Sequence, residues 1–117
     1  MPLSFERSIG DLPDWVDKEV SLQGRVIVAN RHNSYIASSY EAFQRGERLP
    51  VDDDKQIAQQ LLRTLPAFGG GDCIYDEEVM LTGTIRRNEM GLYLADLRSC
   101  EVRRDGMSVA IQLVARS

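Results

Sequence analysis

Hydrophobic and polar residues alternate along residues 19–28, which is the pattern of a β-strand with one buried face. The inward positions are Val20, Leu22, Gly24, Val26 and Val28. A glycine weakens the middle of a strand, so Gly24 predicts a bulge or a sharp bend where a sheet coils on itself.

The same pattern occurs a second time in the chain. Residues 17–26 read DKEVSLQGRV and residues 76–85 read DEEVMLTGTI, with five of ten positions identical. Each copy carries its glycine at the same place, as Gly24 and Gly83. Closing a sheet into a small barrel requires long strands to bend. We interpret the repeat as two strands under the same bending demand rather than as a gene duplication.

Two shorter stretches predict the strands that follow the first one. Residues 34–43 (SYIASSYEAF) read as a returning strand with a break near Ser38 and Ser39. Residues 47–52 (ERLPVD) read as a short third strand, in which Pro50 favours a position near an edge or a strand end.

The C-terminal third predicts two more strands. Residues 91–102 (GLYLADLRSCEV) run back from the second long strand, and residues 108–116 (SVAIQLVAR) form a last edge strand. Leu97 is out of phase with the other apolar residues of 91–102, so we expect a bulge near Asp96.

Residues 52–66 (DDDKQIAQQLLRTLP) change to the period of an amphipathic helix. Asp53 is placed to cap its N-terminus, Gln56 completes a capping box and Pro66 ends the helix. The apolar stripe consists of Ile57, Ala58, Leu61, Leu62 and Leu65.

The element order predicts a mainly β fold with one helix: three strands, a helix, two strands and a C-terminal strand. This order and the glycine placement resemble an OB-fold over residues 17–104, which implies an antiparallel Greek-key barrel. The alternative is an open α+β sheet covered by one helix. We expect one domain over residues 1–117, with 1–16 as an N-terminal lid and 105–117 as an extra edge strand.

Composition places the chain among ordinary globular proteins, with 43% hydrophobic and 27% charged residues. No segment approaches the roughly 18 apolar residues that span a bilayer, and the N-terminus does not read as a signal peptide. We therefore expect a cytoplasmic protein without a membrane partner. The net charge of -4 disfavours a phosphate-neutralising surface as its main feature.

Residues for chemistry are few. The chain has two cysteines without CxxC spacing and a single histidine, so neither a disulfide framework nor a zinc site is indicated. His32 lies in a polar turn, and the glycines at 69–71 lack the lysine of a phosphate-binding loop. The sequence predicts no catalytic site, no metal and no cofactor.

Two acidic clusters flank the predicted helix and the glycine loop. We interpret them as a candidate protein-binding surface, with Phe68 or Tyr75 as a buried anchor. The acidic residues are Asp52, Asp53, Asp54, Asp72, Asp76, Glu77 and Glu78.

A basic and aromatic set is the opposite candidate. OB-folds bind oligonucleotides across the second and third strands and the loops beside them. The residues near those positions suit stacking of bases and contact with phosphates. They are Arg31, His32, Tyr35, Tyr40, Arg86, Arg87 and Tyr93.

Residues 65–105 are loosely similar to immunity proteins of bacterial polymorphic toxins. The likeness lies in a glycine loop, a VTG-like strand and the pattern LxLxDLRS at 92–99. It implies a non-enzymatic inhibitor that blocks the basic cleft of a cognate toxin. The alternatives are an OB-type binder of single-stranded nucleic acid and a structural subunit of a larger assembly. The C-terminal strand allows either a monomer or a homodimer.

Overall fold

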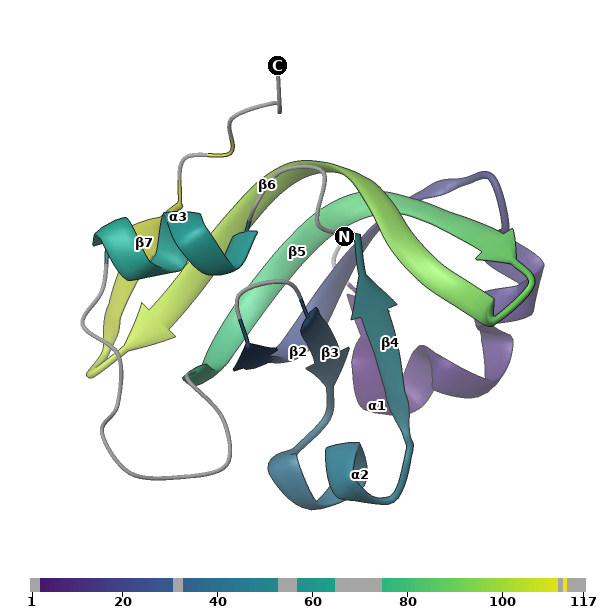
Figure 1. Ribbon diagram of the computed structural model, residues 1–117, viewed down its shortest axis with the longest axis horizontal. Coiled ribbons are helices and arrows are strands. Elements are labelled where there is room, and N and C mark those ends of the chain that lie inside the picture. Colours follow the sequence, from purple (N-terminus) through teal and green to yellow (C-terminus); the bar gives the residue numbers. More distant parts are fainter. Residues whose placement is uncertain (1–2, 31–32, 53–56, 65–74, 112, 114–117) are drawn as a thin grey trace.

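The computed structural model of the 117-residue chain describes residues 3–30, 33–52, 57–64, 75–111 and 113 (Figure 1). The elements in chain order are β1 (Leu3–Ser4), α1 (Phe5–Ser8), the 3-10 helix η1 (Ile9–Trp15), β2 (Glu19–Asn30), β3 (Asn33–Ala37), α2 (Tyr40–Gln44), β4 (Arg48–Val51), α3 (Ile57–Thr64), β5 (Tyr75–Asn88), β6 (Gly91–Arg104) and β7 (Met107–Ala110).

Five of the strands close into a barrel. Their order is β2-β3-β4-β6-β5, and β5 pairs back with β2 to complete the ring. All of these pairings are antiparallel except that of β4 with β6. The predicted OB-like barrel is confirmed, and the closed ring excludes the alternative of an open sheet. β1 and β7 are additional strands on β2 and β6.

The two repeated segments are hydrogen-bonded to each other. β2 and β5 run antiparallel with Leu22 opposite Leu81, Val20 opposite Gly83, and Gly24 opposite Val79. The valine of each repeat therefore lies opposite the glycine of the other, and the pairing has local two-fold symmetry about the central leucines.

Each repeated glycine lies where the next strand crosses closely. A methyl group added to Gly24 would lie 2.7 Å from the carbonyl oxygen of Ala37 on β3, and one added to Gly83 would lie 2.7 Å from that of Ala95 on β6. No side chain fits at that distance without movement of the backbone. Figure 1 shows β5 and β6 curving strongly around the barrel, as the sequence predicts for strands with such glycines.

The predicted bulge near Asp96 is also confirmed. Between the pairs Thr82–Ser99 and Thr84–Ala95 the register of β5 and β6 shifts. Asp96 has a φ of 50°, in the left-handed region that aspartate tolerates better than most residues. The bulge turns Leu97 inward, and its side chain is buried.

One predicted strand is partly wrong. Residues 34–43 form a strand only as far as Ala37, and α2 follows the expected break. Ser39 caps this helix, because its side-chain oxygen accepts a hydrogen bond from the Ala42 N–H at 3.1 Å. The N-terminal segment adds α1 and η1, so the fold contains more than the one helix expected.

The hydrophobic core fills the barrel and continues under α3, the N-terminal segment and the residues after β7. α3 buries Ile57, Ala58 and Leu61 as its predicted stripe requires, and the expected cap at Asp53 and Gln56 lies outside the described residues. The N-terminal segment adds the buried side chains of Phe5 and Leu12 to the same core. After β7, Ile111 is buried and its N–H donates to the Cys100 carbonyl at 2.8 Å.

Replacement of Gly24 or Gly83 tests whether closure of the barrel depends on these close approaches of the backbone. Gly24→Ala and Gly83→Ala should each lower the free energy of unfolding by about 2 kcal/mol or more, because the new methyl group strikes a backbone oxygen. Gly10→Ala is the matched control, since nothing lies within 4 Å of its added methyl group. Urea denaturation measures all three, and equal effects would contradict this account.

Cys100 provides a probe of core integrity. Burial raises the pKa of its thiol from an ordinary value of 9.0 to about 12. The thiolate is the reactive form, so in a Cys73→Ser variant a thiol reagent should label Cys100 only as fast as the protein opens. Rapid labelling in native buffer at mildly alkaline pH, compared with labelling in urea, would show that the core is open at β6.

Candidate functional site

The seam between β4 and β6 is short and opens into a groove. These parallel strands share the single register pair Val51–Leu94, and the Asp52 N–H donates to the Leu94 carbonyl at 2.8 Å. The next backbone group of β4 with the same orientation is two residues earlier, at Pro50. Proline has no N–H, so β4 cannot donate the next hydrogen bond of the ladder. The two strands separate on this side of the pair.

The groove has a volume of about 300 Å³. Tyr35 of β3 and Pro50 of β4 line one side, and Leu92, Tyr93 and Met90 of the β5–β6 hairpin line the other. Asn33, Ser34 and Asn88 supply the polar atoms. None of the lining residues carries a charge. The site is therefore aromatic and apolar, with amide groups at its margin.

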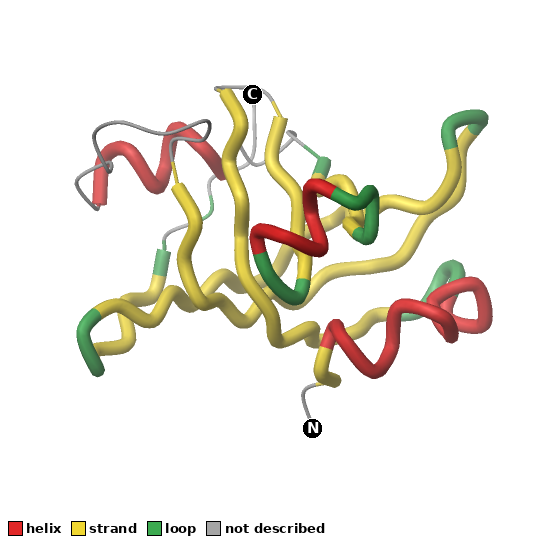
Figure 2. Tube along the Cα trace, turned by 90° about the horizontal axis from the view of Figure 1, so that it is seen from below, coloured by secondary structure: helices red, strands yellow, loops and turns green. Residues whose placement is uncertain are grey.

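Met90 is the most exposed large apolar side chain of the described residues. It is 94% exposed and lies in the turn that joins β5 to β6. Figure 2 shows this hairpin extending away from the body of the barrel, with its turn in green at the right. An extended hairpin with an exposed methionine presents apolar surface beside the groove.

Tyr35 is held in place by an aromatic cluster. Its ring centroid lies 5.3 Å from that of Phe43, and the Arg48 guanidinium lies 4.9 Å from the Tyr35 ring and 4.6 Å from the Phe43 ring. Tyr40 stacks on Phe43 at 5.9 Å and does not line the groove. The cluster fixes one wall of the groove and places a positive charge near it.

The two arginines of the hairpin have different roles. Arg86 donates to Asp17 at 2.8 Å and to Asp96 at 3.0 Å, and these hydrogen bonds raise the pKa of its guanidinium. Arg86 therefore connects β5 to two places, the segment before β2 and the bulge of β6. Arg87 is exposed, and no ion pair is found for it among the described residues. Arg31 and His32 lie outside the described residues.

The acidic segment 76–78 is largely paired within the protein. The Asp76 carboxylate accepts from Arg25 Nε at 2.7 Å, and the buried Glu77 is paired with Arg104. Glu78 is exposed. Two of these three carboxylates therefore hold strands together, which reduces the charge they offer to a partner.

Tyr75 does not offer its side chain to a partner as the anchor that the sequence suggested. Its side chain is fully buried, and its hydroxyl donates to the Leu61 carbonyl at 3.0 Å, which joins β5 to α3. Desolvation raises the pKa of this hydroxyl. Asp52 follows β4 and is half-buried. Asp53, Asp54, Phe68 and Asp72 lie outside the described residues.

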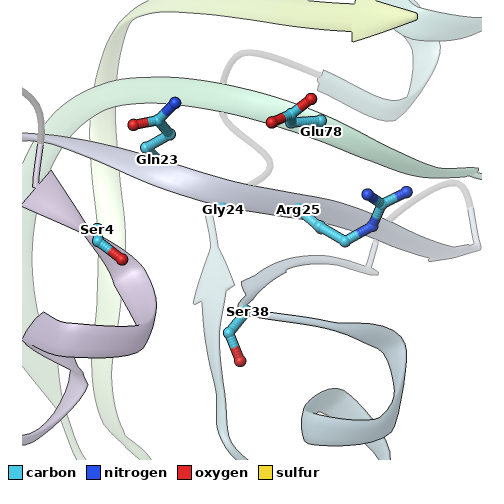
Figure 3. Close-up of a pocket in the computed structure, with 6 residues that line it drawn as sticks. All are labelled: Ser4, Gln23, Gly24, Arg25, Ser38 and Glu78. Carbon is cyan, nitrogen blue, oxygen red and sulfur yellow. The ribbon is translucent and has the colours of Figure 1, made fainter.

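A second hollow, of about 250 Å³, lies on the outer face of β2 around Gly24 (Figure 3). Figure 3 shows Gln23 and Glu78 on neighbouring strands, with Ser4 and Ser38 approaching from other segments. Arg25 and Glu78, its two charged residues, are register partners of opposite sign. Because the Arg25 guanidinium also binds Asp76, this hollow offers little net charge to a ligand, and the groove is the better candidate site.

Comparison with protein-family models, with curated proteins and with solved structures found no match. Within the described part of the chain, no helix is long and apolar enough to cross a membrane. Nor do the described residues include a group of three or more histidine, cysteine, aspartate or glutamate side chains arranged to hold a metal ion.

The sequence anticipated part of the groove. The sequence predicts Tyr35 and Tyr93 near a ligand, but it gives no indication of Leu92 or Met90. The usable signal was Pro50, because a proline within a strand marks a place where a ladder stops. Which strand would separate from it depends on the closed topology.

The structural role of Glu77 can be tested against an exposed ion pair. Glu77→Ala removes the buried carboxylate that pairs with the half-buried Arg104, and should lower the free energy of unfolding by about 3 kcal/mol. Glu47→Ala removes the exposed pair with Arg45 and should change it by less than about 1 kcal/mol. Urea denaturation measures both, and a neutral Glu77→Ala would return Glu77 to the candidate binding surface.

Proposed function

We propose that this protein is a non-enzymatic binding module that holds part of another protein in the groove between β4 and the β5–β6 hairpin. The observation that carries the proposal is the uncharged, aromatic lining beside an exposed methionine. The cores of protein interfaces are enriched in aromatic residues and methionine and depleted of most charged residues. Tyrosine is also common among the side chains that dominate binding energy.

The partner class that we propose is a bacterial toxin or effector, which the protein would inhibit in the cytoplasm by occupying its surface. The support is the likeness of residues 65–105 to immunity proteins and the acidic composition, with a net charge of -4. A negative net charge speeds encounter with a basic partner. In this proposal the groove supplies the anchor that Tyr75, buried in the core, does not.

Single-stranded nucleic acid is a second candidate, which one observation favours. Tyr35 and Tyr93 line the groove at the position where OB-folds bind oligonucleotides, and Arg48 lies on the Tyr35 ring. The neutral lining and the commitment of Arg86 to two aspartates make it the weaker candidate.

Capture of partners from nuclease-treated native lysate tests the proposal with two methionine variants. Met90→Asp should lose the partner that the wild-type protein retains, because a charge is placed beside the groove. Met107→Asp is the matched control, since Met107 is also exposed but lies in β7, at the opposite end of β6. With the isolated partner, Met90→Asp should weaken binding about thirtyfold, the equivalent of a hot-spot residue.

Three outcomes would contradict this function. The first is a partner retained equally by both variants, and the second is no protein retained at all. The third is binding of a fluorescent oligothymidylate that weakens steeply with salt and is lost in Tyr93→Ala, which would favour the nucleic-acid candidate.

A further inference from the structure

Along the groove, β6 is paired with β4 at a single position of the described chain. Ile85 donates its N–H to the Lys18 carbonyl at 3.1 Å, and its carbonyl accepts from the Asp17 N–H at 2.7 Å. Both backbone groups of Ile85 therefore face away from β6. Pairs in an antiparallel ladder alternate between hydrogen-bonded and non-hydrogen-bonded, so Ile85–Leu94 belongs to the second kind. Two residues further along, Arg87–Leu92 belongs to it as well.

The other side of β6 gives the same orientation. The Leu94 carbonyl accepts from Asp52 of β4, so the backbone groups of Leu94 and of Leu92 point towards β4. In this parallel register Leu92 lies opposite Leu49, and the Leu92 carbonyl would accept from the N–H of residue 50, which is a proline and has none to donate. β4 and β6 are paired only at Val51–Leu94 within the described chain. The Leu92 N–H and carbonyl thus face the groove.

The side chains around this edge define what would fit. Tyr35 and Tyr93 form uncharged walls for one apolar or small polar side chain. Arg87 is the register partner of Leu92, so its side chain is on the same face of the hairpin, exposed and without an ion pair among the described residues. A carboxylate next to the inserted side chain would complement this arginine.

We infer that the groove binds an extended peptide segment of the partner by strand addition at Leu92. The peptide backbone pairs with the Leu92 N–H and carbonyl, an uncharged side chain lies between Tyr35 and Tyr93, and an acidic residue lies by Arg87. This inference rests on the proposed protein-binding function and specifies its chemistry. A peptide backbone offers both a donor and an acceptor, as Leu92 requires, whereas a phosphodiester backbone offers acceptors only.

Amide exchange provides the direct test. Linear peptides would be selected from a phage-displayed random library on the full chain, and a synthetic copy of the best one added to the labelled protein. Exchange of the Leu92 amide, measured by NMR, should slow about tenfold or more on binding, because a free edge amide becomes hydrogen-bonded. The Tyr93 amide faces β5 and is the internal control, so its exchange should not change comparably.

Pro50→Val tests whether the edge of β6 at Leu92 is the binding site, because it allows β4 to pair with that edge. The new N–H can pair with the Leu92 carbonyl, so β4 and β6 should join further and the protein should become more resistant to heat. The same variant should bind the selected peptide about tenfold less well. Misfolding would lower both heat resistance and peptide binding. Higher heat resistance together with weaker peptide binding would therefore show that β4 has paired with the edge.

Charge reversal tests the acidic residue of the peptide. Arg87→Glu should weaken peptide binding about fivefold, and Arg103→Glu, another exposed strand arginine, should leave it unchanged. Equal effects of the two variants would overturn the placement of the peptide at Arg87.

Failure of this inference can be separated from failure of the proposed function. If the selected peptide binds but Leu92 exchange is unchanged, strand addition is wrong. If no groove-dependent peptide is selected while the native partner is still lost in Met90→Asp, strand addition is again wrong, and the proposed function stands. If an oligothymidylate protects the Leu92 amide and no peptide does, both are wrong.

Discussion

The close antiparallel pairing of β2 with β5 is the constraint on which the rest of the fold depends. It brings the two repeats together about Leu22 and Leu81 and closes the ring of strands. The ring can close only because β3 and β6 cross at Gly24 and Gly83, where a side chain would meet a backbone oxygen. The same geometric requirement, close approach of a neighbouring strand at a glycine, applies to both repeats, which are related by a local two-fold axis. This requirement explains the repetition in the sequence.

The groove lies where the closed ring of strands is least completely paired. A closed barrel leaves few strand edges, and an unpaired edge normally invites association with another chain. Here the seam between β4 and β6 stays short because Pro50 interrupts its hydrogen bonds, while β5 and β6 continue as a paired hairpin beyond it. The described chain therefore presents a limited edge, flanked by Tyr35 and Tyr93, at the seam of the barrel with the fewest paired residues.

Local patterns were sufficient to predict the long strands, their bending at the repeated glycines, the bulge at Asp96 and the apolar stripe of α3. They failed at residues 40–44, where the cap at Ser39 and stacking of Tyr40 on Phe43 accompany a helix rather than a strand. The site was only partly predictable for a different reason. Pro50 and Leu92 are distant in sequence, and only the closed topology shows that Pro50 lacks the N–H that the Leu92 carbonyl would otherwise accept from.

The acidic segment shows why charge in a sequence is a poor guide to a surface. Asp76 and Glu77 look available until Arg25 of β2 and Arg104 of β6 are placed beside them. Arg86 looks available until Asp17 and Asp96 reach it. At physiological salt, charges act over only about 8 Å, so the net charge of -4 matters less to a docked segment than its immediate neighbours do. Arg87 is such a neighbour, and an acidic protein can therefore favour an acidic residue at this edge.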